Sequence, residues 1–242
     1  MMTIPEPKHE RTWHSRRGFT LIELSIVLIV IAILTSIAVV GSDVYRNAVG
    51  VKIYSEFIQG WISAFDTYVT RTGGALPGDD PTAPTGLVNG HPISLSSNTG
   101  WLCDGTSAPS LSQAMLQAGV TLPSGRGPGR ASTYVYQDKA GFAHELRVCL
   151  GTVTDWSILA PGGTTLATKT VLRVTGLTPD LARQLNSMID GRIDAGLGNL
   201  REERSRAGGQ SVNWSSDATQ DINGGSNTEL QSQELVANLV LN

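Results

Sequence analysis

Residues 16–23 read Arg16-Arg17-Gly18-Phe19-Thr20-Leu21-Ile22-Glu23 and lead directly into an apolar run from Leu24 to Val40. This stretch places one carboxylate, that of Glu23, at the mouth of a long hydrophobic segment. A charge in the middle of a bilayer costs between about 2.5 and more than 10 kcal/mol, depending on the scale. The carboxylate therefore needs a positive partner, and this need points to an assembly of several chains.

The apolar run is long enough for a membrane helix. Leu24 to Val40 is 17 residues, and adding Phe19 to Ile22 brings it to about the 20 residues that span a bilayer. The apolar core of an ordinary secretory signal is shorter, about 7–15 residues. Because the basic residues precede the run, the positive-inside rule keeps the N-terminus in the cytoplasm. We therefore predict a single-pass helix in the inner membrane over residues 19–42, with the rest of the chain exported.

The residues from Gly18 to Glu23 resemble the processing site of type IV prepilins and type II secretion pseudopilins. Glycine, phenylalanine and glutamate stand at the family's spacing, with a basic leader before them and an apolar helix after them. The resemblance covers residues 11–72. It implies that a prepilin peptidase removes residues 1–18 by cutting between Gly18 and Phe19, that Phe19 is then N-methylated, and that Glu23 serves assembly.

The physical chemistry of the junction agrees with this resemblance. Cleavage would create a cationic amine at Phe19, and Glu23 follows four residues later on the same helix end. The amine of a neighbouring subunit can then offset the Glu23 carboxylate, which the helix dipole also favours in the first turn. Phe19, Thr20 and Glu23 form the predicted assembly site. The resemblance implies other subunits, an assembly ATPase and an inner-membrane platform as partners.

Helical periodicity continues beyond the membrane segment, over residues 43–71. Apolar side chains recur at spacings of three and four, which is typical of an amphipathic helix with one face against a core. The stripe consists of Val51, Tyr54, Ile58, Trp61, Phe65 and Tyr68. We predict that this helix forms the spine of the exported domain and ends at Thr72-Gly73-Gly74.

Residues 72–242 combine loops with shorter strand and helix segments. Strands are predicted at 133–136, 146–150 and 170–174, the first two as a hairpin, with 156–159 as a fourth candidate. Short helices are predicted at 110–118 and after Thr178. The second helix has an apolar face of Leu181, Leu185, Met188, Ile189 and Ile193, and the chain is polar from about residue 208. The sequence thus predicts an α+β fold with a leader (1–18), a membrane and filament-core helix (19–42) and an exported domain (43–242). In that domain the long helix packs on a small antiparallel sheet.

Two cysteines, Cys103 and Cys149, lie in the predicted exported domain. An even number of cysteines in an oxidising compartment favours a disulfide. The alternative is a pair of separate buried thiols.

Two pairs of aspartates are weak candidates for a calcium site. Asp79 and Asp80 lie in an oxygen-rich loop, and Asp190 and Asp194 are four residues apart near the end of a predicted helix. Ordinary turn and capping roles explain both pairs better. We therefore expect no cofactor.

No catalytic motif stands out, and two of the four histidines lie in the predicted leader. The formal net charge is −3; residues 1–18 hold four Lys and Arg and two Glu, a contribution of +2, so the remainder carries −3 − 2 = −5. An acidic domain gives no electrostatic case for nucleic-acid binding.

These features predict a non-enzymatic, pilin-like structural subunit of a type IV pilus or a type II secretion pseudopilus. The length of the chain favours a minor subunit. Two alternatives remain open: a signal-anchored periplasmic enzyme or ligand-binding protein, and a tip adhesin or DNA-uptake minor pilin.

Overall fold

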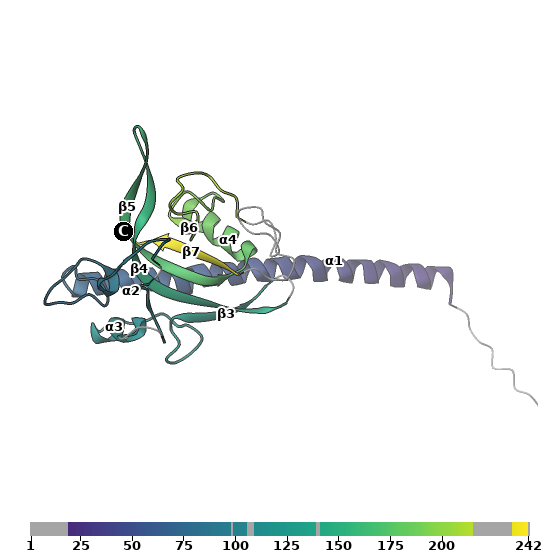
Figure 1. Cartoon of the computed structure of the whole chain (residues 1–242). Coiled ribbons are helices and arrows are strands. Elements are labelled where there is room, and N and C mark those ends of the chain that lie inside the picture. The colour runs from purple at the N-terminus through teal and green to yellow at the C-terminus, as the bar shows by residue number, and fades with distance from the viewer. Residues whose placement is uncertain (1–18, 98, 106–108, 139–140, 215–233, 242) are drawn as a thin grey trace, which may run out of the picture. The chain divides into compact units, whose positions relative to one another are not determined.

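The computed structural model describes residues 19–97, 99–105, 109–138, 141–214 and 234–241, and only the backbone of residues 38–43 and 46 (Figure 1). The chain divides into two compact units, residues 1–45 and 46–242. We call the described part of the second unit the head. The fold class is α+β, as predicted. The functional boundaries expected at residues 18 and 42 stay predictions.

Helical structure runs without a break from Leu21 to Arg71. Helix α1 (Leu21–Lys52) passes into a π-helical segment (Ile53–Ile58) and then into α2 (Gln59–Arg71). Most of the predicted amphipathic stripe points into the head, where Ile58, Trp61 and Phe65 are buried. Val51 is an exception at 52% exposed, and the fully buried Ile53 and Phe57 were not part of the predicted stripe. The helix ends where expected, because Gly73 adopts a left-handed φ of 70° and the Gly74 amide bonds back to the Val69 carbonyl.

The head is built on a seven-stranded sheet with the order β1-β4-β5-β7-β6, to which β2 and β3 add along β4. Strand β1 is parallel to β4 and the other pairs are antiparallel, so the sheet is mixed and larger than predicted. The strands are β1 (Pro92–Ile93), β2 (Leu102–Cys103), β3 (Thr133–Gln137), β4 (Ala143–Ala160), β5 (Gly163–Leu177), β6 (Leu200–Glu202) and β7 (Leu235–Val240).

The predicted hairpin between residues 133–136 and 146–150 is confirmed as β3 and β4. The strands after it are longer than expected: β4 has 18 residues and β5 has 15. The extra length of β5 was not predicted, because its first residues, Gly163 to Leu166, are exposed and show no apolar alternation. Backbone pairing between β4 and β5 continues to Ala160 and Gly163, and Figure 1 shows the tip of this hairpin extending past the neighbouring strands.

Strand β7 corrects the view of the C-terminal region as a polar tail. It lies between β5 and β6, and its side chains Leu235, Ala237 and Leu239 are buried. On its other face Asn238 is fully buried and Val240 packs against the smaller core, so both faces of β7 are covered. Its place in the sheet depends on pairing with β5, which lies far away in the sequence.

The main core fills the space between one face of the sheet and the helices. It includes Ile53, Phe57 and Trp61 from the helices and Leu146, Val148 and Leu150 from β4. Since successive strand residues point to opposite faces, Glu145, Arg147 and Cys149 lie on the other face. A second, smaller core on that face contains Ile93, Trp101, Cys149, Val153, Trp156 and Val171.

The two predicted short helices are present. Thr178 caps α4 (Pro179–Asp190) as expected, and the helix begins with a proline. Ser110 also caps its helix, α3 (Leu111–Gln117), although it was predicted as the first residue of that helix. One detail was wrong: Ile193 does not belong to the apolar face of the second helix. Gly191 adopts a left-handed φ of 71° and ends α4, so Ile193 lies beyond the helix and is 53% exposed.

We expect Gly176→Ala to destabilise the head by at least about 2 kcal/mol, from a left-handed backbone strain plus a steric clash. Gly176 has a φ of 79°, and a Cβ there would lie 2.1 Å from the Glu145 carbonyl oxygen. Gly86→Ala is the matched control, because Gly86 has a φ of 72° and open space around it. Urea unfolding of both variants measures the difference; equal losses would contradict the clash.

Candidate processing and assembly site

The first turn of α1 contains a reciprocal cap between Thr20 and Glu23. The Thr20 amide and hydroxyl both donate to Glu23 Oε2, each at 2.8 Å, and the Glu23 amide donates back to Thr20 Oγ1 at 3.3 Å. This is a capping box, which satisfies amides that the first helical turn leaves without partners. The Thr-x-x-Glu spacing carried this signal in the sequence, and the sequence analysis missed it.

The predicted processing residues Gly18, Arg16 and Arg17 lie outside the described residues. Phe19, the residue predicted to become the new N-terminus, is described and is 90% exposed. Among the described residues, no cation forms an ion pair with Glu23. The capping box therefore orients the Glu23 carboxylate, but within the described residues no cation neutralises its charge.

The apolar run that follows is not packed against any other described part of the chain. Every residue from Leu21 to Ile37 is exposed, and Val30, the least exposed of its large apolar side chains, is still 48% exposed. A helix that is apolar on all sides is normally buried in a membrane or in a larger assembly. In the described part of the chain, no helix reaches the combination of length and apolarity required to cross a membrane.

The predicted disulfide between Cys103 and Cys149 is present. The two sulfurs are 2.06 Å apart, and the two residues are directly opposite each other in β2 and β4. The bond ties the two-residue strand β2 to the longest strand of the sheet. It closes a segment with a sequence separation of 46.

The aspartates of the first candidate calcium pair hold a loop together. Asp79 accepts hydrogen bonds from the Thr85 amide and hydroxyl and from the Gly86 amide. Asp80 accepts from the amide and hydroxyl of Thr82, which is an Asx turn. Burial tends to raise the pKa of Asp79, but the bonds from Thr85 and Gly86 outweigh it and lower that pKa.

The second pair, Asp190 and Asp194, does not share a helix face, because α4 ends at Asp190. Asp190 accepts from the amides of Asn199 and Leu200. Asp194 is buried and accepts from the Ser211 hydroxyl and from three backbone amides, those of Gly196, Leu197 and Val212. Burial raises the pKa of Asp194, and these bonds lower it by more, to below its usual value. In the described residues, no three His, Cys, Asp or Glu side chains are placed to hold a metal ion.

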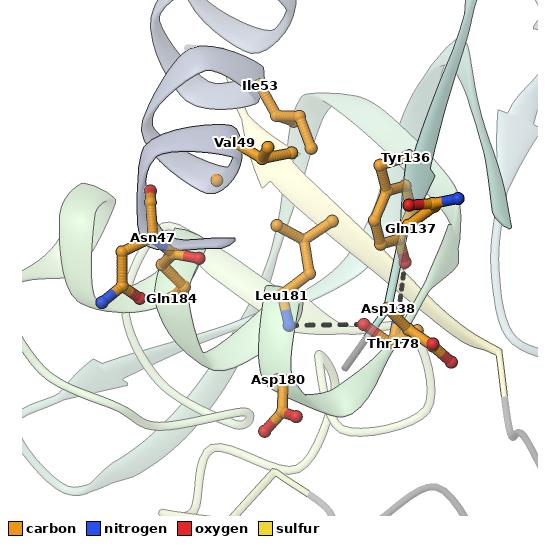
Figure 2. Close-up of a pocket in the computed structure, with 11 residues that line it drawn as sticks. Asn47, Val49, Ile53, Tyr136, Gln137, Asp138, Thr178, Asp180, Leu181 and Gln184 are labelled. Carbon is orange, nitrogen blue, oxygen red and sulfur yellow. Dashed lines mark hydrogen bonds between the residues drawn. The ribbon is translucent and has the colours of Figure 1, made fainter. Parts of the chain in front are cut away.

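A small cavity of about 130 Å³ lies in the head between the end of α1, the end of β3 and the start of α4 (Figure 2). Ligand sites usually have about 300–1,000 Å³, so this one resembles a packing defect more than a substrate pocket. Its Tyr136 hydroxyl donates to the Gly176 carbonyl and accepts from the Thr178 amide. Burial raises the pKa of Tyr136 to about 12, so the phenol stays protonated and has a structural role.

Comparisons with known proteins add one match to this geometry. Residues 13–39 match the model of the prokaryotic N-terminal methylation motif. No curated protein and no solved structure matches the chain. The matched residues include the capping box and most of the exposed apolar run described above. The chain therefore carries the prokaryotic N-terminal methylation motif, which is the prepilin-type signature of type IV pilins and pseudopilins.

Proposed function

We propose that this protein is a non-enzymatic, pilin-like structural subunit that polymerises through its N-terminal helix. In this proposal a prepilin peptidase cleaves between Gly18 and Phe19, Phe19 is N-methylated, and residues 19–42 anchor the chain in the inner membrane before assembly. The observation that carries the proposal is the position of Glu23. It stands inside the matched motif, at the head of a helix whose residues from Leu21 to Ile37 are all exposed.

The geometry supports a simple assembly step. Thr20 holds the Glu23 carboxylate at the N-terminal end of the helix by two hydrogen bonds. When helices pack side by side, the Phe19 amine of a neighbouring subunit can approach the same end. A charge pair in a low-dielectric core is favourable only when both charges have partners and hydrogen bonds, and Thr20 supplies the hydrogen bonds. This pairing would fix the axial offset between subunits while apolar side chains cover one another.

The partners follow from this mechanism. They are other pilin or pseudopilin subunits, the prepilin peptidase and an inner-membrane assembly platform with its ATPase. The Cys103–Cys149 disulfide fits a head that folds in the periplasm, because such bonds persist in oxidising compartments. A chain of 242 residues with a large head suits a minor subunit of a type IV pilus or of a type II secretion pseudopilus.

Replacing Gly18 separates this proposal from a signal-anchored enzyme or ligand-binding protein. We expect Gly18→Val to accumulate as the full-length precursor and to be missing from sheared filaments, because bulk at the cut site blocks the peptidase. Thr12→Val, which changes the leader away from the cut, is the control and should be processed normally. Immunoblots of membranes and sheared filaments give the answer. Normal processing and incorporation of Gly18→Val would refute the proposal.

A further inference from the structure

A groove of about 430 Å³ lies in the head beside the disulfide and along β4. Its volume falls in the range of about 300–1,000 Å³ that is usual for ligand sites. The floor is formed by Glu145, Arg147 and Cys149 of β4, with Cys103 bonded to Cys149. The rim includes Arg130, from the glycine- and arginine-rich loop before β3. This run, Gly125 to Arg130, lacks the Lys-Ser/Thr ending of a phosphate loop and has the composition of a flexible turn.

The charges around the groove are arranged around one carboxylate. Glu145 receives Arg126 Nη1 at 2.8 Å and Arg147 Nε at 2.9 Å, so two guanidinium groups share a single negative charge. A third, that of Arg130, forms no ion pair within the part of the chain that the structure describes. The local balance is therefore positive, although the chain after residue 18 has a net charge of −5.

The second carboxylate at the groove does not cancel this excess. Asp104 accepts from the amide and the hydroxyl of Ser112, at 2.7 and 2.5 Å, and so anchors the first turn of α3. Burial raises the pKa of Asp104 and the bonds from Ser112 lower it by more, so it is ionised but already satisfied. The lining itself is balanced, with Arg130 and Arg147 against Glu145 and Asp104. Arg126 lies outside the lining but bonds to Glu145, and counting it brings the local charge to +1.

Arginine donors remain available for a ligand. Arg147 donates to Glu145 through Nε, and within the described residues its two terminal nitrogens have no acceptor. Its side chain is 68% exposed, so these terminal nitrogens face solvent beside Glu145. A guanidinium presents paired donors that match the two oxygens of a carboxylate. The hydroxyls of Thr133 and Thr175 in the same groove already donate to the backbone carbonyls of Arg130 and Arg147, and that of Ser132 bonds to Asp104. The free donors of the groove are therefore those of the arginines.

We propose that this groove binds a carboxylate-bearing segment of a partner protein, held by Arg130 and Arg147. A nucleic acid presents a row of phosphates and is usually met by an extended basic surface. Arg130 and Arg147 lie in one groove rather than along an extended basic surface, and the chain after residue 18 is acidic. Both facts favour a short acidic peptide segment over a nucleic acid as the ligand. The proposal does not require that the chain polymerises, because the groove lies entirely in the head.

A titration of the purified full chain in neutral detergent tests the proposal. The probe is an acetylated tetraglutamate peptide, and a tetraglutamine peptide of the same length is the uncharged comparison. The double variant Arg130→Gln/Arg147→Gln removes the two proposed donors and leaves Arg126 on Glu145. The matched control, Lys52→Gln/Arg192→Gln, removes two exposed cations elsewhere. Far-ultraviolet circular dichroism checks that each variant is folded. If the double variant does not fold, Arg130→Gln alone replaces it, because Arg130 makes no ion pair in the described head.

We expect calorimetry to show tetraglutamate binding that weakens at least about ten-fold in the groove variant and less than about two-fold in the control. Tetraglutamine should not bind. Absence of tetraglutamate binding to the unmodified chain, or equal weakening in both double variants, would overturn the proposal. Tighter, groove-dependent binding of a single-stranded DNA oligonucleotide would also overturn it, by showing a phosphate site.

Discussion

The Glu23→Leu protein should be cleaved and inserted in the membrane, yet absent from the filament. Leucine removes the one carboxylate at the head of the helix, so the Phe19 amine of a neighbouring subunit would be buried without its partner. Leaving one member of a buried charge pair alone costs about 3–5 kcal/mol. That is roughly a hundred-fold to several thousand-fold in the equilibrium for adding a subunit. Immunoblots of sheared filaments and of membranes measure both parts of the expectation.

A Glu23→Gln variant separates the charge from the helix cap. Glutamine retains an oxygen that can accept from the Thr20 amide and hydroxyl, so the first turn of α1 should keep its capping box. It carries no charge, and we expect assembly to fail as it does for Glu23→Leu. Normal incorporation of Glu23→Leu would contradict the assembly role. Recovery by Glu23→Gln alone would assign Glu23 to helix capping.

Loss of the disulfide should have the second-largest effect. A Cys103→Ser/Cys149→Ser head is expected to lose about 4 kcal/mol of unfolding free energy, because the sequence separation of 46 gives a large loop-closure entropy. Domains of ordinary stability have about 5–15 kcal/mol in total, so the loss is a large fraction. Strand β2 should detach first, since it has only two residues paired with β4.

Guanidinium unfolding of the full chain in detergent, followed by tryptophan fluorescence, measures this loss. Trp101 lies next to β2 in the smaller core and therefore reports on that region. The unmodified protein treated with a reductant is the matched control and should move toward the variant. An unchanged midpoint in the serine variant would show that packing alone holds β2 in place.

The features of residues 16–72 could be predicted from the sequence because each depends on residues that are close together in the chain. The spacing from Gly18 to Glu23, the apolar run and the helical stripe ending at Thr72 each lie within a few turns of one helix. Caps such as Thr178 were readable for the same reason, since a cap bonds to an amide three residues away. The Thr20–Glu23 capping box was not predicted, although its spacing is equally local, because Glu23 was interpreted only as a charge.

The sheet was less predictable because its order depends on pairings between distant residues. Strands β1 and β2 have two residues each and carry no periodicity. Strand β7 joins the sheet by pairing with β5, and β6 joins by pairing with β7. The groove arginines were missed for a related reason. Arg130 and Arg147 come together only because β3 folds back on β4. The run from Gly125 to Arg130 was interpreted as a flexible turn, and Arg147 belongs to no motif.

Mass spectrometry of the N-terminal peptide from sheared filaments shows at once whether the chain is cut between Gly18 and Phe19 and whether it enters a filament. We expect a peptide that begins at Phe19 and carries one additional methyl group on its amine. A protein found only in membranes, with residues 1–18 still attached or with its cut elsewhere, would contradict it.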